Sequence, residues 1–190
     1  VFTKAHTKKC RYEFIYYTHY NLAMIKSYFT YIFILFCVSI FAQGEANIWY
    51  FGVNAGLNFN SNPPTPLLDL PTGTFSSEGC STISDANGNL LFYTNGEKVW
   101  NRVFQIMSNG DNLAGHNSST QSSAIIPYPG TYNFTENRFD KYFLVTLDDY
   151  GVQAPNAEDK GVCYSEIDMT LDNGFGSITQ YQYIHLFGAT

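Results

Sequence analysis

From Asn47 onward, apolar residues recur at every second position or gather in short runs, and Gly, Asn, Asp or Pro interrupts them every eight to twelve residues. A period of two is the period of a β-strand, and regularly spaced turn residues are typical of antiparallel sheets. The pattern therefore predicts an all-β fold of antiparallel meanders. The expected strands cover residues 48–52, 80–84, 89–94, 97–106, 122–127, 141–147, 161–169 and 177–186.

Two Asn-Gly pairs divide residues 83–101 into short strands. The sequence DANG at 85–88 fits a type I turn with Asp first and Gly last, and NG at 95–96 fits a two-residue type I′ hairpin. Between them, NLLFYT at 89–94 carries apolar side chains on both faces. We therefore expect this middle strand to be covered on both sides by neighbouring sheets.

The chain also repeats itself. Residues 81–83 align with 124–126, LLFYTNG with YFLVTLDD, KVWNRVFQIM with GVCYSEIDM, and Asn109-Gly110 with Asn173-Gly174, if loop insertions lie near 130–140 and 150–161. A unit of three or four strands repeated every ~40–50 residues is typical of propeller blades. The repeat predicts a partial β-propeller of about two blades over residues 47–190, and a β-sandwich is the alternative.

The amino-terminal region has a different character. The stretch MIKSYFTYIFILFCVSIFAQGEA, residues 24–46, combines Lys26, an apolar run over 28–42 and small residues before Asn47. This order predicts a secretory signal peptide cleaved between 42 and 46. A membrane anchor is the rival interpretation, but the run is shorter than the ~20 residues a spanning helix needs. Residues 1–23 precede Met24 and are interpreted as a mis-called upstream segment.

Charge and cysteine content narrow the class of protein. The net charge is −6. Residues 1–43 hold five basic and one acidic side chain, which leaves −10 for the remainder, so nucleic acid is not expected as a partner. With the leader removed, Cys80 and Cys163 remain. Two buried free thiols are favoured over a single disulfide, because the spacing is unlike a dense disulfide framework.

Three polar motifs suggest chemistry. Asp85, Asn87 and Asn89 have the spacing of the first calcium-loop ligands, but Leu90 and Gly96 occupy positions that require Gly and Glu, so a turn is favoured. Glu166 and Asp168 lie two apart in a predicted strand and share a face, as an acid–base pair would. The polar side of an edge strand explains them equally simply and is favoured. Asp148 and Asp149 are interpreted as turn residues.

The remaining candidates are weaker. His116 and His185 have no second ligand at a metal-binding spacing. The run HNSSTQSS at 116–123 lacks a nucleophile elbow, and its residues Ser118, Ser119, Thr120 and Gln121 are expected to bond backbone groups. Aromatic side chains that suit either a sugar-stacking platform or, preferably, the core are Trp49, Tyr50, Phe92, Tyr93 and Trp100. We assign no catalytic, cofactor-binding or metal residue, and expect no cofactor.

Four blocks in order carry a family resemblance. They are IWYFGVNAGLNFN (48–60), EGCSTISDANGNLLFYTNGEKVWNR (78–102), SSTQSSAIIPYPG (118–130) and YSEIDMTLDNGFG (164–176). The series resembles the amino-terminal part of large secreted Bacteroidetes proteins that end in a gliding-motility-associated domain, a sorting signal for type IX secretion. The resemblance implies a propeller-like region, export across the outer membrane, and surface attachment or release. Because this chain ends at Thr190, it is expected to be a fragment.

Together these features predict a non-catalytic secreted or cell-surface interaction module within a larger exported protein. The expected partner is extracellular, a polysaccharide or another surface protein, with no membrane association after signal cleavage. A propeller hydrolase acting on extracellular polymers and a purely structural spacer are the alternatives. A binding module should expose an aromatic or polar patch on its loops, for which 116–123 and the insertion at 130–140 are the best places.

Overall fold

We describe the fold from a computed structural model of the chain. The structure describes residues 21–22, 24–31, 44–68, 75–149, 160–180, 182 and 184–187. It divides the chain into two units, Val1–Ala42 and Gln43–Thr190. In the first unit, residues 21–22 and 24–31 are helical. Among the described residues, no helix has the length and apolar character needed to cross a membrane. Most of the segment 1–23, and residues 32–43 of the expected signal peptide, lie outside the described residues.

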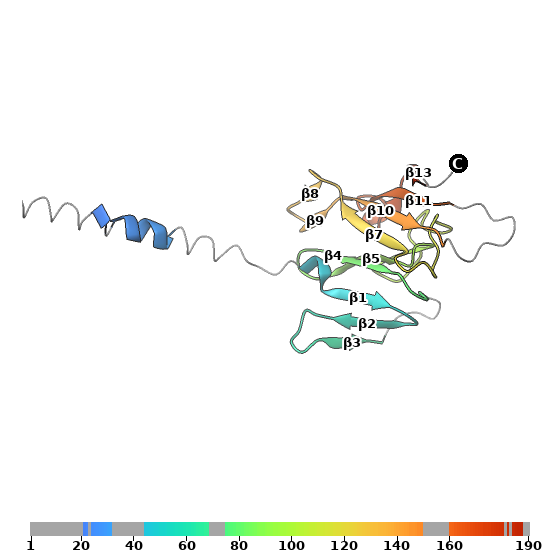
Figure 1. Ribbon diagram of the computed structural model, residues 1–190, viewed down its shortest axis with the longest axis horizontal. Coiled ribbons are helices and arrows are strands. Elements are labelled where there is room, and N and C mark those ends of the chain that lie inside the picture. Colours follow the sequence, from blue (N-terminus) through green and yellow to red (C-terminus); the bar gives the residue numbers. More distant parts are fainter. Residues whose placement is uncertain are drawn as a thin grey trace, which may run out of the picture. The chain divides into compact units, whose positions relative to one another are not determined.

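The second unit confirms the predicted all-β class (Figure 1). Its strands are antiparallel, and the described helical segments are two short 3₁₀ turns, η1 (Gly44–Ala46) and η2 (Asp172–Gly174). The first two sheets contain β1 (Ile48–Phe51), β2 (Ala55–Asn58), β3 (Thr65–Leu67), β4 (Ser81–Ser84), β5 (Leu90–Thr94) and β6 (Val99–Asn101). The third contains β7 (Ser123–Pro127), β10 (Lys141–Leu147), β11 (Val162–Asp168), β12 (Ser177–Ile178) and β13 (Ile184–Phe187).

Each sheet is a meander of strands that follow one another in sequence. The orders are β1-β2-β3, β4-β5-β6 and β7-β10-β11-β12, and β13 also pairs with β11. The insertion predicted near 130–140 forms a separate hairpin of β8 (Tyr132–Asn133) and β9 (Arg138–Phe139). The sequence had indicated about two such groups of strands, and the structure has three, because β2 and β3 return alongside β1.

The first strands of the three sheets lie next to one another, β1 beside β4 and β4 beside β7 (Figure 1). Side chains join them. The Thr82 hydroxyl accepts the backbone N–H of Tyr50 at 3.2 Å, and the Ser81 hydroxyl donates to the Ser123 carbonyl at 2.8 Å. Polar residues at the start of each sheet therefore fix how one sheet follows the next.

The central sheet β4-β5-β6 is covered on both faces, as the apolar run at 89–94 predicted. The strand register shifts between Ile83 and Ser84, which makes Leu91 an extra residue in β5. A bulge of this kind turns two consecutive side chains toward one side. Leu91 and Phe92 accordingly enter the same core, while Tyr93 points into the core on the opposite face.

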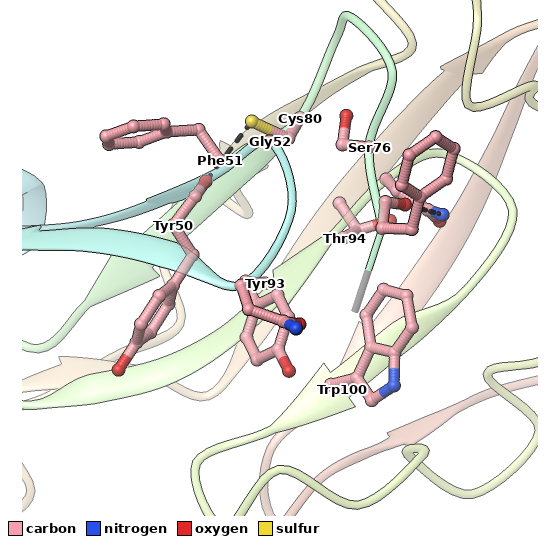
Figure 2. Close-up of a pocket in the computed structure, with 11 residues that line it drawn as sticks. Tyr50, Phe51, Gly52, Ser76, Cys80, Tyr93, Thr94 and Trp100 are labelled. Atoms are coloured by element: carbon pink, nitrogen blue, oxygen red, sulfur yellow. Dashed lines mark hydrogen bonds between the residues drawn. The ribbon is translucent and has the colours of Figure 1, made fainter. Parts of the chain in front are cut away.

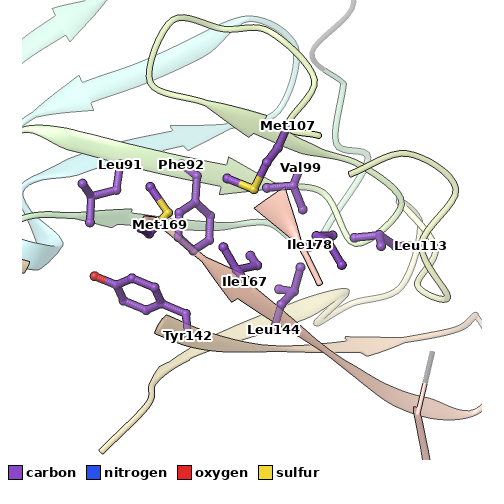
Figure 3. Packing of buried hydrophobic residues seen from close by; sticks show 10 residues of the cluster. All are labelled: Leu91, Phe92, Val99, Met107, Leu113, Tyr142, Leu144, Ile167, Met169 and Ile178. Atoms are coloured by element: carbon purple, nitrogen blue, oxygen red, sulfur yellow. The ribbon is translucent and has the colours of Figure 1, made fainter. Parts of the chain in front are cut away.

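One face of the central sheet packs against the third sheet (Figure 3). We call this interface the aliphatic core. Its fully or nearly fully buried residues are Leu91, Phe92, Val99, Met107, Leu113, Tyr142, Leu144, Ile167, Met169 and Ile178. The other face packs against β1 through Ile48, Tyr50, Tyr93 and Trp100, which we call the aromatic core. Every described sheet thus contributes one or two faces to a common stack.

Of the two predicted turns, one needs correction and the other is confirmed. Val99 pairs with Thr94, so the loop at 95–98 has four residues rather than two, and the Asn95 side chain shapes it by accepting the backbone N–H of Glu97 and of Lys98. At 85–88 the type I turn is confirmed, because the backbone N–H of Gly88 donates to the Asp85 carbonyl at 3.0 Å.

Two strand predictions were too long. The expected strand 97–106 ends at Asn101, whose side-chain oxygen accepts the backbone N–H groups of Val103 and Gln105 and reverses the chain. The expected strand 177–186 is divided into β12 and β13, which pair with different parts of β11. In both places a local polar contact or a change of partner replaces continuous pairing.

Candidate functional site

Glu166 and Asp168 lie on one face of β11, as their spacing predicted, and both contact Lys141. The Lys141 Nζ atom is 3.0 Å from Glu166 Oε1 and 3.6 Å from Asp168 Oδ2. β11 lies between β10 and the strands β12 and β13, so the interpretation as an edge strand is wrong. Glu166 is buried. The pair therefore forms a partly buried ion-pair cluster.

Lys141 and Thr170 favour the charged form of Asp168. Burial acts to raise the pKa of Asp168, but hydrogen bonds from Thr170 and the Lys141 charge outweigh it and lower the pKa. The hydrogen bond to Glu166 raises the pKa of Lys141. A general acid needs a carboxyl group that holds its proton near the working pH. The geometry therefore favours a structural ion pair over acid–base chemistry.

The polar run at 116–123 mainly connects the chain to its neighbours. The Ser122 hydroxyl donates to the Gly79 carbonyl at 2.7 Å, and the Thr120 hydroxyl bonds the Glu78 carboxylate at 3.0 Å. His116 lies 3.7 Å from the Asp149 carboxylate. Hydroxyl-to-backbone bonding was predicted for 118–121, and here Ser122 provides it. The run thus anchors the entry into β7.

Cys163 and His185 lie together beside the third sheet. Cys163 Sγ is 3.4 Å from His185 Nδ1, and both atoms contact the Lys160 carbonyl, at 3.2 and 3.1 Å. Burial raises the pKa of the Cys163 thiol. A reactive cysteine needs thiolate at neutral pH. The contact therefore favours packing. Cys163 and Cys80 are both free thiols, as favoured from the sequence, although Cys80 is only half-buried.

The calcium-like spacing at 85–89 is a turn, as predicted. Asp85 Oδ1 accepts the backbone N–H groups of Asn87 and Asn89, at 2.9 and 2.8 Å, and Oδ2 accepts the Asn89 side-chain amide at 2.9 Å. These bonds occupy the carboxylate within its own turn. Over the described ranges, no cluster of three or more His, Cys, Asp or Glu residues is arranged to hold a metal ion.

The aromatic residues considered as a sugar platform divide between core and surface. Phe92 lies in the aliphatic core, and Tyr50, Tyr93 and Trp100 lie in the aromatic core, so the core interpretation is confirmed for these four. Trp49 is the exception and is 51% exposed. It alternates with Tyr50 along β1 and therefore lies on the other face of the strand.

A pocket opens beside the aromatic core, where Tyr50, Tyr93 and Trp100 stand in a row (Figure 2). Its empty space of about 270 Å³ includes open solvent. The rings of Tyr93 and Trp100 stack with centroids 5.1 Å apart. The Cys80 thiol donates to the Tyr50 carbonyl at 3.2 Å, and burial raises its pKa. The Tyr93 hydroxyl is buried and makes no hydrogen bond within the described part of the chain.

The other face of the first sheet, which we call the outer β1 face, exposes aromatic side chains. Trp49 and Phe51 both lie on this face and alternate along β1 with the buried residues Ile48 and Tyr50. Leu57 of β2 is the register partner of Trp49. The Trp49 ring packs 4.9 Å from the Phe59 ring, and its Nε1 donates to the Ala46 carbonyl at 2.8 Å. An apolar face of this kind marks a surface that packs against another molecule or segment.

An open polar cleft lies where three turns meet, and we call it the turn cleft. It is formed by the turn after β4, the β8–β9 hairpin and the turn after β11, and its empty space of about 1010 Å³ includes open solvent. The charged and amide side chains around it include Asp85, Arg102, Asn133, Glu136, Arg138 and Asp140. It gathers polar residues from several separate parts of the chain.

Two arginines border the turn cleft. Arg138 is buried, with its guanidinium 3.4 Å from the Met169 carbonyl and 3.5 Å from the Asp140 carboxylate. Arg102 lies over the Phe175 ring at 4.5 Å and donates to the Gly174 carbonyl. These contacts hold both side chains in place at the border of the cleft.

The β8–β9 hairpin carries an exposed aromatic tip, whose ring packs with Tyr132 on the face of the hairpin opposite Asn133. Phe134 is 85% exposed. Its ring packs edge-on against Tyr132, with centroids 5.0 Å apart. The Asn133 side chain accepts the backbone N–H groups of Thr135 and Glu136, which shapes the tip. The insertion at 130–140 was one of two places where a binding module was expected to expose an aromatic or polar patch, and Phe134 is exposed there.

Sequence reasoning missed the turn cleft as a site. Its residues come from segments near 85, 102, 138 and 173, and no spacing motif connects them. The available signal was the predicted insertion at 130–140, which combines Tyr132, Phe134 and Arg138. Searches against protein-family models, curated proteins and solved structures found no match.

Proposed function

We propose that this chain is a non-catalytic, exported interaction module of a larger secreted or cell-surface protein. Export is supported by the basic residue, apolar run and small residues in order over 24–46. The resemblance of four ordered blocks to secreted Bacteroidetes surface proteins supports the same destination. The partner is extracellular, either a polysaccharide or another surface protein.

We further propose that the three sheets are consecutive blades of a partial β-propeller. Three meanders follow one another, their first strands β1, β4 and β7 are neighbours, and the central sheet is packed on both faces. Blades around a common channel have this arrangement. A β-sandwich has only two packed layers. The outer β1 face, with Trp49 and Phe51 exposed, is then the surface that a further blade covers.

The exposed aromatic tip of the β8–β9 hairpin, Phe134, is the observation that carries the interaction function. An exposed aromatic side chain that packs against a neighbouring ring suits an anchor at a binding interface. The carboxylates considered for catalysis are bound instead to Lys141. The hydrolase alternative therefore has less support than an interaction role.

The test is a binding assay with the whole exported protein on intact bacterial cells. Fluorescently labelled wild-type protein should bind saturably, and Phe134→Ser should weaken binding by about tenfold or more, because exposed aromatic anchors dominate interfaces. Ile106→Ser removes an exposed apolar side chain outside the hairpin and the outer β1 face and serves as the control. Glycosidase, esterase and peptidase turnover is measured in parallel.

Two results would contradict the proposal. One is the absence of saturable cell-surface binding. The other is turnover that disappears in Glu166→Gln while circular dichroism shows an unchanged fold, because this would make the carboxylate pair catalytic.

A further inference from the structure

The three sheets follow one another in a fixed order, with the central sheet between the other two (Figure 1). The first sheet packs on the central sheet through the aromatic core, and the central sheet packs its other face on the third sheet through the aliphatic core. Each sheet therefore has one face toward the preceding sheet and one toward the following sheet. The outer β1 face precedes the first sheet, and the far face of the third sheet, which we call the outer third face, follows the last one.

The outer third face is apolar across four strands. Along β10, residues of the aliphatic core alternate with the half-buried residues Phe143 and Val145, which lie on the outer third face. Pairing places Ile126 of β7 beside Phe143, and Tyr164 of β11 beside Val145. Tyr164 is in turn paired with Ile184 of β13, which is exposed. Because paired residues share a face, these side chains form one apolar surface.

The first strand of each sheet carries an isoleucine on the side toward the following sheet. Ile48 of β1 is 6% exposed and belongs to the aromatic core. Ile83 of β4 pairs with Phe92 and packs against the aliphatic core. Ile126 of β7 is the third member, and the sequence repeat aligns it with Ile83, yet it is 48% exposed. Another sheet covers the first two isoleucines, and Ile126 lacks such a cover among the described residues.

The outer β1 face has no charge to oppose an apolar contact. Residues 46–68, which include the whole first sheet, contain no Asp, Glu, Lys or Arg, although the chain as a whole is acidic. On the outer third face, Lys141 is paired with Glu166 and Asp168. The cores of protein interfaces are likewise depleted of charged residues and enriched in aromatic ones. Composition therefore favours another apolar sheet as the occupant of the outer β1 face.

We infer that the outer third face of one copy of this chain covers the outer β1 face of a second copy. This inference rests on the proposed blade arrangement and identifies the further blade as the third sheet of another copy. Ile126 would pack against Trp49 and Phe51, as Ile48 packs in the aromatic core. The contact continues the order found within the chain. It is a head-to-tail contact, which produces closed rings or open chains of copies.

The experiment is analytical ultracentrifugation of the exported chain over a range of concentrations. Wild type should associate into dimers or larger assemblies. Phe51→Lys on the outer β1 face and Ile126→Lys on the outer third face should each weaken self-association by at least about tenfold, because each places a charge in an apolar contact. Ile106→Lys, at an exposed apolar position outside both faces, should change it by less than about twofold. Circular dichroism verifies that the variants fold.

A mixture of the two face variants tests the head-to-tail order. Phe51→Lys keeps its outer third face and Ile126→Lys keeps its outer β1 face, so the mixture should form heterodimers although each variant alone is monomeric. A symmetric contact would instead allow one of the two variants to associate alone. Acrylamide quenching of wild-type fluorescence needs no variant. Trp49 is exposed in the single chain and should become less accessible as concentration rises, whereas Trp100 is already buried.

Four results would overturn the inference. They are a folded wild type that stays monomeric, as expected if a blade of the same chain or another protein covers the face, an equal loss of association in Ile106→Lys, a mixture of face variants that stays monomeric, and association that only one face variant weakens. Cell-surface binding that depends on Phe134 would survive each of them, and the proposed interaction function with it. Conversely, a wild type that associates but does not bind cells would contradict that function and support the contact between copies.

Discussion

The central sheet packs against different neighbours on its two faces. The aliphatic core on one side is composed mainly of Leu, Ile, Val and Met side chains that are almost completely buried. The aromatic core on the other side is built on Tyr50, Tyr93 and Trp100, and a pocket opens beside it. Flexible aliphatic and thioether chains fill irregular space well, whereas rigid rings leave gaps.

This difference in packing indicates that the two cores contribute to stability in different ways. The aliphatic core joins two sheets by close packing and should supply most of the stability. The aromatic core joins β1 to the central sheet through the tilted ring contact of Tyr50 with Tyr93, the hydrogen bond from the Tyr50 backbone to Thr82 and the close backbone approach at η1. Substitutions in the two cores should therefore change the free energy of unfolding by different amounts and even in opposite directions.

The largest effect is expected from Leu144→Ala in the aliphatic core. Leu144 is fully buried on β10, so the substitution leaves a cavity and should lower the free energy of unfolding by about 2–5 kcal/mol. Val145→Ala, on the opposite and only half-buried face of the same strand, should cost clearly less. Urea denaturation of both variants measures the difference. Equal losses of unfolding free energy in the two variants would mean that the aliphatic core does not supply most of the stability.

Gly44→Ala tests the close approach that supports the aromatic side. A Cβ atom at Gly44 would lie 2.5 Å from the Gly88 backbone nitrogen and 2.6 Å from the Ala86 carbonyl oxygen. The turn cannot yield easily, so stability should fall by about 1–3 kcal/mol.

The control for Gly44→Ala is Asn87→Ala, at an exposed position of the same turn, which should have little effect on urea denaturation. If both variants unfold like wild type, η1 does not hold β1 in place. A measurable loss would also indicate that Gly44–Ala46 belong to the mature fold, which places any signal cleavage before Gly44.

Much of this architecture follows from pattern. The strand expected at 141–147 coincides with β10, because its residues alternate between a buried and a half-buried face. Apolar residues on both faces of 89–94 predicted the double coverage of β5. The strands β2 and β3 were missed because Gly56 and Pro66 interrupt segments of only four and three residues. Such short strands exist through pairing with β1 rather than through their own propensity.

The turn cleft was less accessible to sequence reasoning, for a physical reason. A cleft is formed by side chains from separate turns, and its shape depends on how the sheets pack. Asp85 read alone is a turn residue, and Arg138 read alone is a surface charge, yet the structure buries Arg138 at the cleft. Only the exposed aromatic hairpin was visible as a local pattern in 130–140.

Tyr93→Phe should reveal the looser packing of the aromatic core by a gain in stability. Tyr93 is 5% exposed, and its hydroxyl has no hydrogen-bond partner among the described residues. Removing an unsatisfied buried hydroxyl should raise the free energy of unfolding by about 1 kcal/mol. Tyr142→Phe in the aliphatic core is the matched control, because that hydroxyl is hydrogen-bonded to the Phe139 backbone and its loss should destabilise. Destabilisation by both substitutions would show that the Tyr93 hydroxyl has a partner, such as an ordered water.

The smallest effect concerns the ion-pair cluster on the third sheet, remote from the aromatic core. Hydrogen bonds from Thr170 and the Lys141 charge lower the pKa of Asp168 in the folded chain despite its burial. A depressed carboxyl pKa stabilises the fold above the unfolded pKa, and this contribution is lost as pH falls through the folded pKa. Between about pH 5 and about pH 2, wild type should therefore lose more stability than Asp168→Asn, by less than about 1 kcal/mol because the cluster is partly solvated. If the unfolding free energies of wild type and Asp168→Asn, measured by urea denaturation, fall in parallel with pH, Asp168 does not have this role. A steeper fall in Asp168→Asn would mean that ionised Asp168 destabilises the fold.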